Sequence, residues 1–320
     1  MNESRRLGQT TVTMSPLGLG TWQFSQGHGL VGSFWPRLED SLITEIVKAA
    51  WEGGMNWFDT AEIYGGGASE RALARALHRL AIDPAQVRIA TKWWPLGRTA
   101  RSLVNRLEER QQALDGYPVT LYQIHQPWSL SSRKALADGL IRLLKAQKIT
   151  AAGISNFSAA AMTEMAHRLN DAGYPLAANQ VRYNLWDRAI ERNGILSAAE
   201  ELGITIIAYS PLHQGLLSGK FHQPGATRPE GLRRWQMTSA LVEKTRPLIH
   251  LLTEIGARYQ KSPSQVALNW ILGASSQVVA IPGATRPDQA AKAAEAMHFR
   301  LTPDEREALS TLSRQLSQPG

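Results

Sequence analysis

The 320-residue sequence contains no cysteine. Without thiols the chain has no disulfide, no thiolate zinc site and no cysteine nucleophile. It also lacks any run of about 18 apolar residues that could span a bilayer, and residues 1–18 lack the apolar core of a signal peptide. These absences predict a cytoplasmic protein with no membrane partner.

Concentrated basic segments are missing as well. The 35 Lys and Arg against 27 Asp and Glu give a net charge of +8, but the basic residues are scattered and do not alternate with aromatic residues. We therefore expect no nucleic-acid partner. A hydrophobic fraction of 43% and a charged fraction of 19% are typical of a globular protein. The length fits one α/β barrel, so residues 1–320 are predicted to form a single domain.

Short apolar runs alternate with longer segments of helical period along most of the chain. The six runs that begin at residues 57 to 204 start 27 to 32 residues apart, which is close to one strand-helix-strand unit. One earlier and one later run bring the number of predicted strands to eight: 17–21, 57–61, 87–92, 119–125, 149–156, 176–181, 204–210 and 277–283. Eight parallel strands favour a (β/α)8 TIM barrel over a doubly wound sheet.

Helices and a hairpin complete the predicted fold. Two segments between strands carry apolar residues on one helical face, namely Leu38, Leu42, Ile43, Ile46, Val47 and Ala50, and then Leu136, Leu140, Leu143 and Leu144. The segment before residue 19 predicts an N-terminal β-hairpin around Gly8 and Gln9. Sequence segments of helical period after the seventh predicted strand indicate extra helices towards the C-terminus.

The ends of three consecutive predicted strands carry ionisable side chains. Asp59 ends the second strand and Tyr64 follows it, Lys92 ends the third, and His125 ends the fourth. Taken singly, each has an ordinary structural interpretation, such as a helix cap, a solvated strand end or a packed core residue. The carboxyl ends of barrel strands converge on one face, so we expect all four side chains to meet there.

This set of groups suits the protonation of a carbonyl oxygen. Asp59 and Lys92 can neutralise each other at a buried position. A nearby ammonium group is expected to lower the pKa of the Tyr64 phenol, which then acts as a proton donor. His125 can donate a hydrogen bond to the same oxygen as negative charge develops on it. The set contains no nucleophile and no metal ligand cluster.

Eight segments together resemble the aldo-keto reductase superfamily over nearly the whole chain. They are LGLGTW (17–22), NWFDTAEIYGGGASE (56–70), ATK (90–92), LYQIHQP (121–127), GISNF (153–157), NQVRYN (179–184), AYSPLHQGLLSGK (208–220) and IPGATRPDQ (281–289). The resemblance implies a TIM-barrel reductase that transfers hydride from NADPH to an aldehyde or ketone. It also implies that Asp59, Tyr64, Lys92 and His125 are the catalytic residues.

The same resemblance implies a set of cofactor contacts. Ser155, Asn156 and Gln180 match the residues that bind the nicotinamide carboxamide, and Tyr209 matches the aromatic ring that stacks on the nicotinamide. Ser210, Leu212, Gly215, Leu217 and Ser218 match the loop around the pyrophosphate. Further implied contacts are Gly20, Thr21, Trp22, Pro211, Lys220, Ile281 and Gly283.

The adenosine end departs from the family pattern. Thr285 and Arg286 match positions that meet the 2′-phosphate, and a guanidinium at that place favours NADPH over NADH. Gln289 alone remains of the residues expected at the adenine. Lys292 and Ala293 replace an acidic residue and an asparagine that the family often has there, so adenine binding must differ.

Aromatic residues suggest the nature of the substrate. Trp22, Trp93, Trp94 and Trp128 follow predicted strand ends and are expected to wall a pocket for a flat or apolar carbonyl compound. Trp235, in the long loop after the seventh strand, is a further candidate. Arg228, Arg233 and Arg234 in that loop either face solvent or shield an anionic substrate or the cofactor.

Three other functions deserve comparison. The glycines of YGGGASE do not follow the first strand as a Rossmann fingerprint does, and no suitable acid follows on a second strand. A glycoside hydrolase would pair Asp59 with Glu62 or Glu70, yet paired carboxylates usually come from different strands. The third alternative is an NADPH-binding regulatory or redox-sensing subunit on the same barrel with little turnover.

Overall fold

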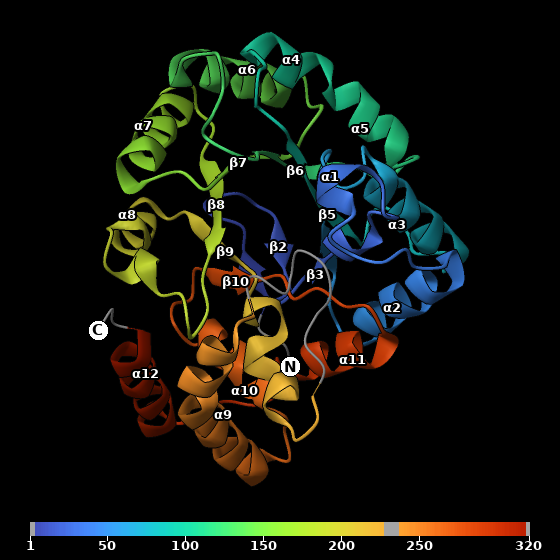
Figure 1. Cartoon of the computed structure of the whole chain (residues 1–320). Helices are drawn as coiled ribbons and strands as arrows, with labels where there is room; N and C mark the ends of the chain where they lie inside the picture. The colour runs from blue at the N-terminus through green and yellow to red at the C-terminus, as the bar shows by residue number, and fades with distance from the viewer. Residues whose placement is uncertain (1–3, 227–236, 318–320) are drawn as a thin grey trace.

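A parallel sheet of eight strands forms the centre of the molecule. The computed structural model describes residues 4–226 and 237–317. Strands β3 to β10 hydrogen-bond to their neighbours in chain order, and all seven pairings are parallel. Two isolated bridges, Leu17 with Ala280 and Gly20 with Gly283, join the first strand to the last. The predicted barrel is confirmed (Figure 1).

The eight predicted strands are all present, most of them a little shorter than expected. They are β3 (Leu19–Gly20), β4 (Trp57–Asp59), β5 (Arg88–Trp93), β6 (Val119–Ile124), β7 (Ala151–Ser155), β8 (Leu176–Arg182), β9 (Thr205–Tyr209) and β10 (Val278–Ala280). The single-domain assignment of residues 1–320 stays a prediction.

Helices surround the strands as an outer ring (Figure 1). The α-helices are α1 (Gly29–Gly32), α2 (Asp40–Glu52), α3 (Ala68–Arg79), α4 (Ala100–Asn105), α5 (Leu107–Ala113), α6 (Arg133–Lys145), α7 (Ala159–Asn170), α8 (Ile195–Leu202), α9 (Ser239–Tyr259), α10 (Pro263–Leu272), α11 (Pro287–Glu295) and α12 (Pro303–Ser317). The short 3₁₀ helices in the described residues are η1 (Trp22–Phe24), η2 (Ala189–Glu191), η3 (His213–Ser218) and η4 (Lys220–His222). Both predicted apolar faces are largely buried, on α2 and α6, except that Leu38 lies just before the start of α2. No helix in the described ranges is long and apolar enough to cross a bilayer.

The N-terminal hairpin closes one end of the barrel. Strands β1 (Arg5–Arg6) and β2 (Thr13–Met14) pair antiparallel, and Leu7 and Met14 are buried among residues of the barrel interior. Gly8 lies against Ala177 and accepts the left-handed backbone that the turn requires, with φ +55°. Ala177 lies near the start of β8, so the hairpin covers the amino ends of the strands. The carboxyl ends stay available for a site.

A buried carboxylate fastens α3 to the barrel. The Glu70 side chain is fully buried, accepts a 2.6 Å hydrogen bond from Thr91 Oγ1, and lies 3.1 Å from Arg110 Nη1. Burial raises the pKa of Glu70 from 4.5 to about 7, although the charge of Arg110 opposes the shift. The folded protein therefore holds a proton on Glu70 that the unfolded chain releases at lower pH.

The raised pKa of Glu70 predicts that the free energy of unfolding depends on pH. Because the folded-state pKa is raised, the stability gained from Glu70 is fully present below pH 4.5 and is lost as pH rises through about 7. At about 1.4 kcal/mol per pH unit, the loss approaches about 3 kcal/mol. Urea unfolding at a series of pH values should show that Glu70→Gln removes this decline. Glu45→Gln, an exposed change on α2, is the control and should keep it. The same slope in Glu70→Gln and wild type would contradict the account.

Candidate functional site at the carboxyl ends of the strands

An ion pair lies buried at the carboxyl ends of β4 and β5. Lys92 is 0% exposed and Asp59 is 1% exposed, and Lys92 Nζ donates to Asp59 Oδ1 at 2.5 Å and to the Thr60 carbonyl at 2.8 Å. The other carboxylate oxygen of Asp59 accepts from Gln180 Nε2 at 2.8 Å and from Gln123 Nε2 at 3.4 Å. Both charges are thus compensated by direct partners, as burial requires.

Tyr64 lies directly above this pair. Three consecutive glycines with positive φ, Gly65 to Gly67, form the turn after it, and a Cβ on Gly65 would stand 2.2 Å from the Ser25 carbonyl oxygen. Position 65 is therefore closed to larger residues. Lys92 Nζ lies 5.1 Å from the centre of the Tyr64 ring.

The pKa of Tyr64 shifts in the opposite direction from the sequence prediction. Burial raises it well above its usual value of 10, and the negative charge of Asp59 raises it further. The expected lowering by Lys92 is wrong for this geometry, because burial and the Asp59 charge raise the pKa and the ammonium is hydrogen-bonded to Asp59 and Thr60. Tyr64 is accordingly a neutral phenol that keeps its proton.

His125 follows β6 and completes the group. Its ring meets Tyr64 edge to face at 5.8 Å between centroids, and Trp94 at 5.3 Å. Burial, helped by the charge of Lys92, lowers the pKa of His125 well below its usual 6.5, so the imidazole is neutral near pH 7. Its Nδ1 is buried without a hydrogen-bond partner among the residues that the structure describes. The four side chains predicted from the strand ends do lie together.

The residues expected at a nicotinamide carboxamide lie beside this group. Ser155 ends β7 and Asn156 follows it, and Asn156 Oδ1 accepts from the Tyr209 hydroxyl at 3.0 Å. Asn156 and Ser210 have left-handed backbones, with φ of +63° and +50°. Such conformations are costly for residues other than glycine and often mark functional sites. Gln180 joins this group to the buried pair, since its Nε2 donates to Asp59.

The segment expected to surround a pyrophosphate follows β9. His213, Gln214 and Gly215 all have positive φ, with 95° at Gly215. A Cβ on Gly215 would meet Lys220 Cε at 2.9 Å, so the lysine side chain passes over the glycine backbone. Ser218 Oγ donates to the Gly215 carbonyl at 2.7 Å, Pro211 and Leu217 are buried, and Leu212 is partly buried. Leu217 is part of the core rather than exposed in the loop.

The residues expected near adenosine lie at the start of α11. Thr285 donates through its backbone N–H and its hydroxyl to Gln289 Oε1, at 2.8 and 3.2 Å. Arg286 is 61% exposed and pairs through two hydrogen bonds with Asp288, at 2.8 and 3.0 Å. Ile281 is buried and donates its N–H to the Ala208 carbonyl at 3.1 Å.

The expected contacts near β3 divide into two kinds. Gly20 joins the barrel seam by its bridge to Gly283, and Thr21 is fully buried, with its hydroxyl bonded to the Asp59 carbonyl at 3.0 Å. These residues support the barrel through these contacts. Trp22 instead faces the site, because its ring stacks on Tyr64 at 6.1 Å between centroids.

Two of the tryptophans predicted to wall a substrate pocket lie beside Tyr64 and His125. Trp22 and Trp94 contact Tyr64 and His125, and Trp128 is 57% exposed near the same strand ends. The placement of Trp93 was wrong: it is fully buried in the core and donates to Ser102 Oγ at 3.1 Å.

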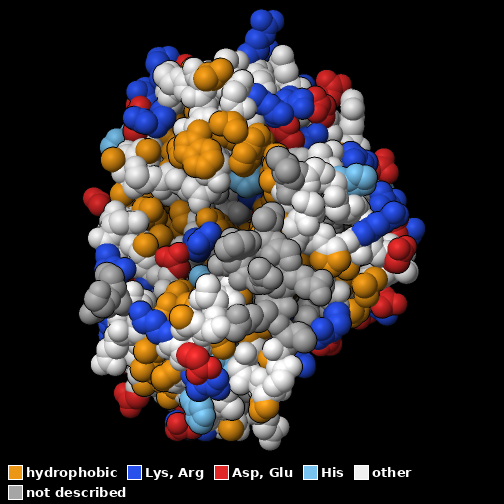
Figure 2. All heavy atoms as spheres, viewed as in Figure 1, with side chains coloured by type: hydrophobic (Ala, Val, Ile, Leu, Met, Phe, Trp, Pro, Cys, Tyr) orange, Lys and Arg blue, Asp and Glu red, His pale blue; other side chains and the backbone are white. Residues whose placement is uncertain are grey.

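Leu96 and Leu130, in the same loops as Trp94 and Trp128, are 59% and 73% exposed. Figure 2 shows hydrophobic side chains gathered on this face. Trp235, Arg228, Arg233 and Arg234 lie outside the described residues.

Glu62 is a residue whose importance the sequence did not reveal. It is 5% exposed, two positions before Tyr64, and accepts hydrogen bonds from the Trp94 N–H at 3.1 Å, Arg106 Nε at 2.9 Å and Arg98. These arginines lower its pKa against the opposing effect of burial. Glu62 therefore joins the Tyr64 turn to the loop that carries Trp94, and does not pair with Asp59 as a hydrolase would require.

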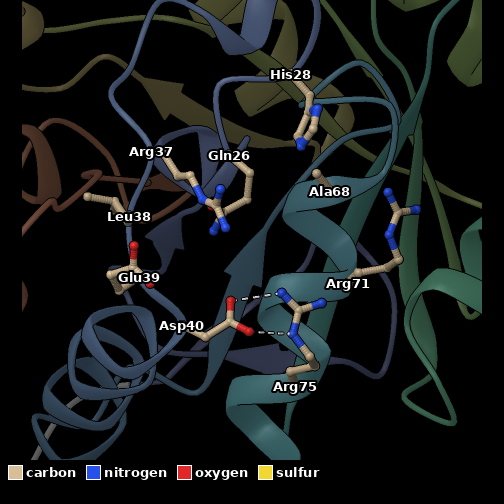
Figure 3. A pocket seen from close by; sticks show the side chains of 9 residues that line it. All are labelled: Gln26, His28, Arg37, Leu38, Glu39, Asp40, Ala68, Arg71 and Arg75. Atoms are coloured by element: carbon tan, nitrogen blue, oxygen red, sulfur yellow. Dashed lines mark hydrogen bonds and ion pairs between the residues drawn. The ribbon is translucent and has the colours of Figure 1, made fainter.

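A polar pocket lies beside the amino ends of α2 and α3 (Figure 3). Within it Asp40 accepts two 2.8 Å hydrogen bonds from Arg75, and Gln26, His28 and Arg37 are among the other lining residues. None of the residues predicted for the site lines this pocket. In the described ranges, no three His, Cys, Asp or Glu side chains are grouped to hold a metal ion.

Known proteins of similar sequence include oxidoreductases. An uncharacterized oxidoreductase of Mycobacterium tuberculosis is 35% identical over 312 residues, covering 94% of this chain and 90% of the relative. A chloroplastic pyridoxal reductase of Arabidopsis thaliana is 31% identical over 309 residues, covering 92% and 82%.

Solved structures share the fold. The glycerol dehydrogenase of Gluconobacter oxydans superposes with a TM-score of 0.85 at 27% identity, covering 99% of this chain and 97% of the other. An aldo-keto reductase of Klebsiella pneumoniae in complex with NADPH has a TM-score of 0.76 over 100% and 96% of the two chains. At 22% identity, this second likeness shows the fold alone. The model of the Aldo/keto reductase family matches residues 16–314, and the chain belongs to this family of oxidoreductases.

Proposed function

We propose that the protein is an NADPH-dependent reductase of aldehydes and ketones, with Tyr64 as the general acid. The observation that carries this proposal is the buried Asp59–Lys92 pair directly below the neutral phenol. A bound NADPH would supply the hydride. Tyr64 would give its proton to the carbonyl oxygen, and the neutral His125 ring, 5.8 Å away, would bond to the same oxygen as its charge grows.

In this proposal Lys92 offsets the negative charge that Tyr64 acquires when it gives up its proton. A Tyr64 that has given up its proton is an anion in a site that disfavours anions, as its raised pKa shows. The ammonium of Lys92, 5.1 Å from the ring centre, stabilises that anion, while Asp59 keeps Lys92 charged against the lowering of its pKa by burial. The pair therefore acts during proton transfer rather than in the resting protein.

Several features of the chain fit a nicotinamide dinucleotide. The left-handed segment from His213 to Gly215, crossed by the Lys220 side chain, would lie against a pyrophosphate, and the His213 and Gly215 N–H groups hold its shape by bonding to the Ser210 and Leu212 carbonyls. Asn156 and Tyr209, joined at 3.0 Å, would give an amide to the nicotinamide carboxamide and a ring to the nicotinamide face. Arg286 provides a guanidinium for the 2′-phosphate, which favours NADPH over NADH.

We infer an apolar, flat carbonyl compound as the substrate. Trp22, Trp94 and the exposed Trp128 supply aromatic faces around Tyr64 and His125. The Arabidopsis relative, 31% identical, bears the name pyridoxal reductase, and pyridoxal is itself a flat aromatic aldehyde.

The Tyr64→Phe variant tests the general acid. Because phenylalanine keeps the ring but has no proton to give, the rate of NADPH consumption with aromatic aldehydes should fall by at least about a hundredfold. NADPH binding, followed by tryptophan fluorescence, should change little. Equal rates for variant and wild type would refute the assignment. No turnover by wild type that still binds NADPH would support the regulatory alternative.

The Arg286→Ala variant tests the choice of cofactor. Loss of a charge-assisted contact should raise the NADPH dissociation constant about tenfold or more, while NADH binding should change less than about twofold. Titration of tryptophan fluorescence with each cofactor measures both constants. Equal losses for NADPH and NADH would show that Arg286 does not meet the 2′-phosphate.

A further inference from the structure

Gln23 is a buried amide at the mouth of the barrel to which no role has yet been assigned. It lies on η1 and is 8% exposed. Its amide group covers Gly283: a Cβ built on that glycine would stand 2.3 to 2.6 Å from Gln23 Nε2, Oε1 and Cδ. The amide therefore occupies the space that any side chain at position 283 would take.

The side-chain oxygen of this amide, Oε1, is buried and has no hydrogen-bond partner in the part of the chain that the structure describes. A buried polar group without a partner destabilises a fold by about 1–3 kcal/mol, so the group makes no contribution to stability through hydrogen bonding. A methionine of similar size would fill the same space at lower cost. The position therefore suggests a partner outside the described residues, and a bound molecule at the barrel mouth is the one we consider.

The surroundings of Gln23 indicate which partner this is. Its neighbour Trp22 stacks on Tyr64, at the end of the site where the carbonyl would react. On its other side, Gly283 is two residues before Thr285 and three before Arg286, the expected contacts of the 2′-phosphate. Gln23 thus lies between the nicotinamide end and the adenosine end. The middle of a dinucleotide consists of the pyrophosphate and its two riboses.

We propose that Gln23 binds the pyrophosphate and an adjoining ribose of the nicotinamide cofactor, in a position that only a glycine at 283 leaves open. The amide offers a donor to a phosphate oxygen and an acceptor to a ribose hydroxyl. This inference rests on the proposed function, because it requires a dinucleotide in the site. It predicts that Gln23 acts on NADPH and NADH alike, unlike Arg286.

Equilibrium titration of the full chain with NADPH, NADH and 2′-AMP tests the proposal. Gln23→Met should weaken NADPH and NADH by about the same factor, roughly tenfold, because both contain the pyrophosphate. Binding of 2′-AMP, which lacks that group, should not change.

Gly283→Ala should weaken both dinucleotides as well, because its Cβ displaces the amide. Gln26→Met is the matched control, since Gln26 lies on the same segment but faces the pocket of Figure 3. It should bind as wild type does.

Thermal unfolding of the protein without cofactor separates a binding role from a structural one. Gln23→Met should have an unchanged or higher Tm, since it removes an unsatisfied amide. A lower Tm with unchanged cofactor binding would overturn the proposal, and so would a loss for only one of the two dinucleotides. If wild type binds neither dinucleotide, the proposed function fails. If wild type binds both and Gln23→Met binds equally well, only the role of Gln23 fails.

Discussion

The buried ion pair between Asp59 and Lys92 is the constraint on which the rest of the site depends. Either charge alone would be very costly at 1% exposure or less. Together they are stable only with the Thr60 carbonyl and the amides of Gln123 and Gln180 around them. Strands β4, β5, β6 and β8 must therefore end in register at this one point. The barrel provides that register, and the hairpin at the opposite end leaves the point accessible.

The same burial determines the protonation states around the pair. It raises the pKa of the Tyr64 phenol and lowers that of the His125 imidazole, so both rings are neutral at rest. In the proposed reaction, charge appears on Tyr64 only as its proton leaves, and Lys92 is close enough to stabilise it at that moment. In this arrangement Tyr64 is a proton donor that carries no negative charge until the reaction occurs.

The sequence predicted the architecture and the four central residues because both follow from local patterns. Strand-helix alternation predicts the barrel, and polar residues that end apolar strands predict its active face. Trp93 was misplaced because a strand buried on both faces shows no alternation that separates the barrel interior from the helix side. The pKa of Tyr64, the partners of Glu62 and the position of Gln23 against Gly283 depend on burial and on contacts between distant segments, which no local pattern contains.

The most direct test is the rate of NADPH consumption by the double variant Asp59→Asn/Lys92→Met. Removing both charges avoids the unpaired buried charge that either single change would leave, so the barrel should still fold and bind NADPH. With no cation beside it, Tyr64 can no longer give up its proton readily. The account predicts a rate at least about a hundredfold below wild type with an aromatic aldehyde. A folded double variant that reduces the aldehyde at the wild-type rate would contradict it.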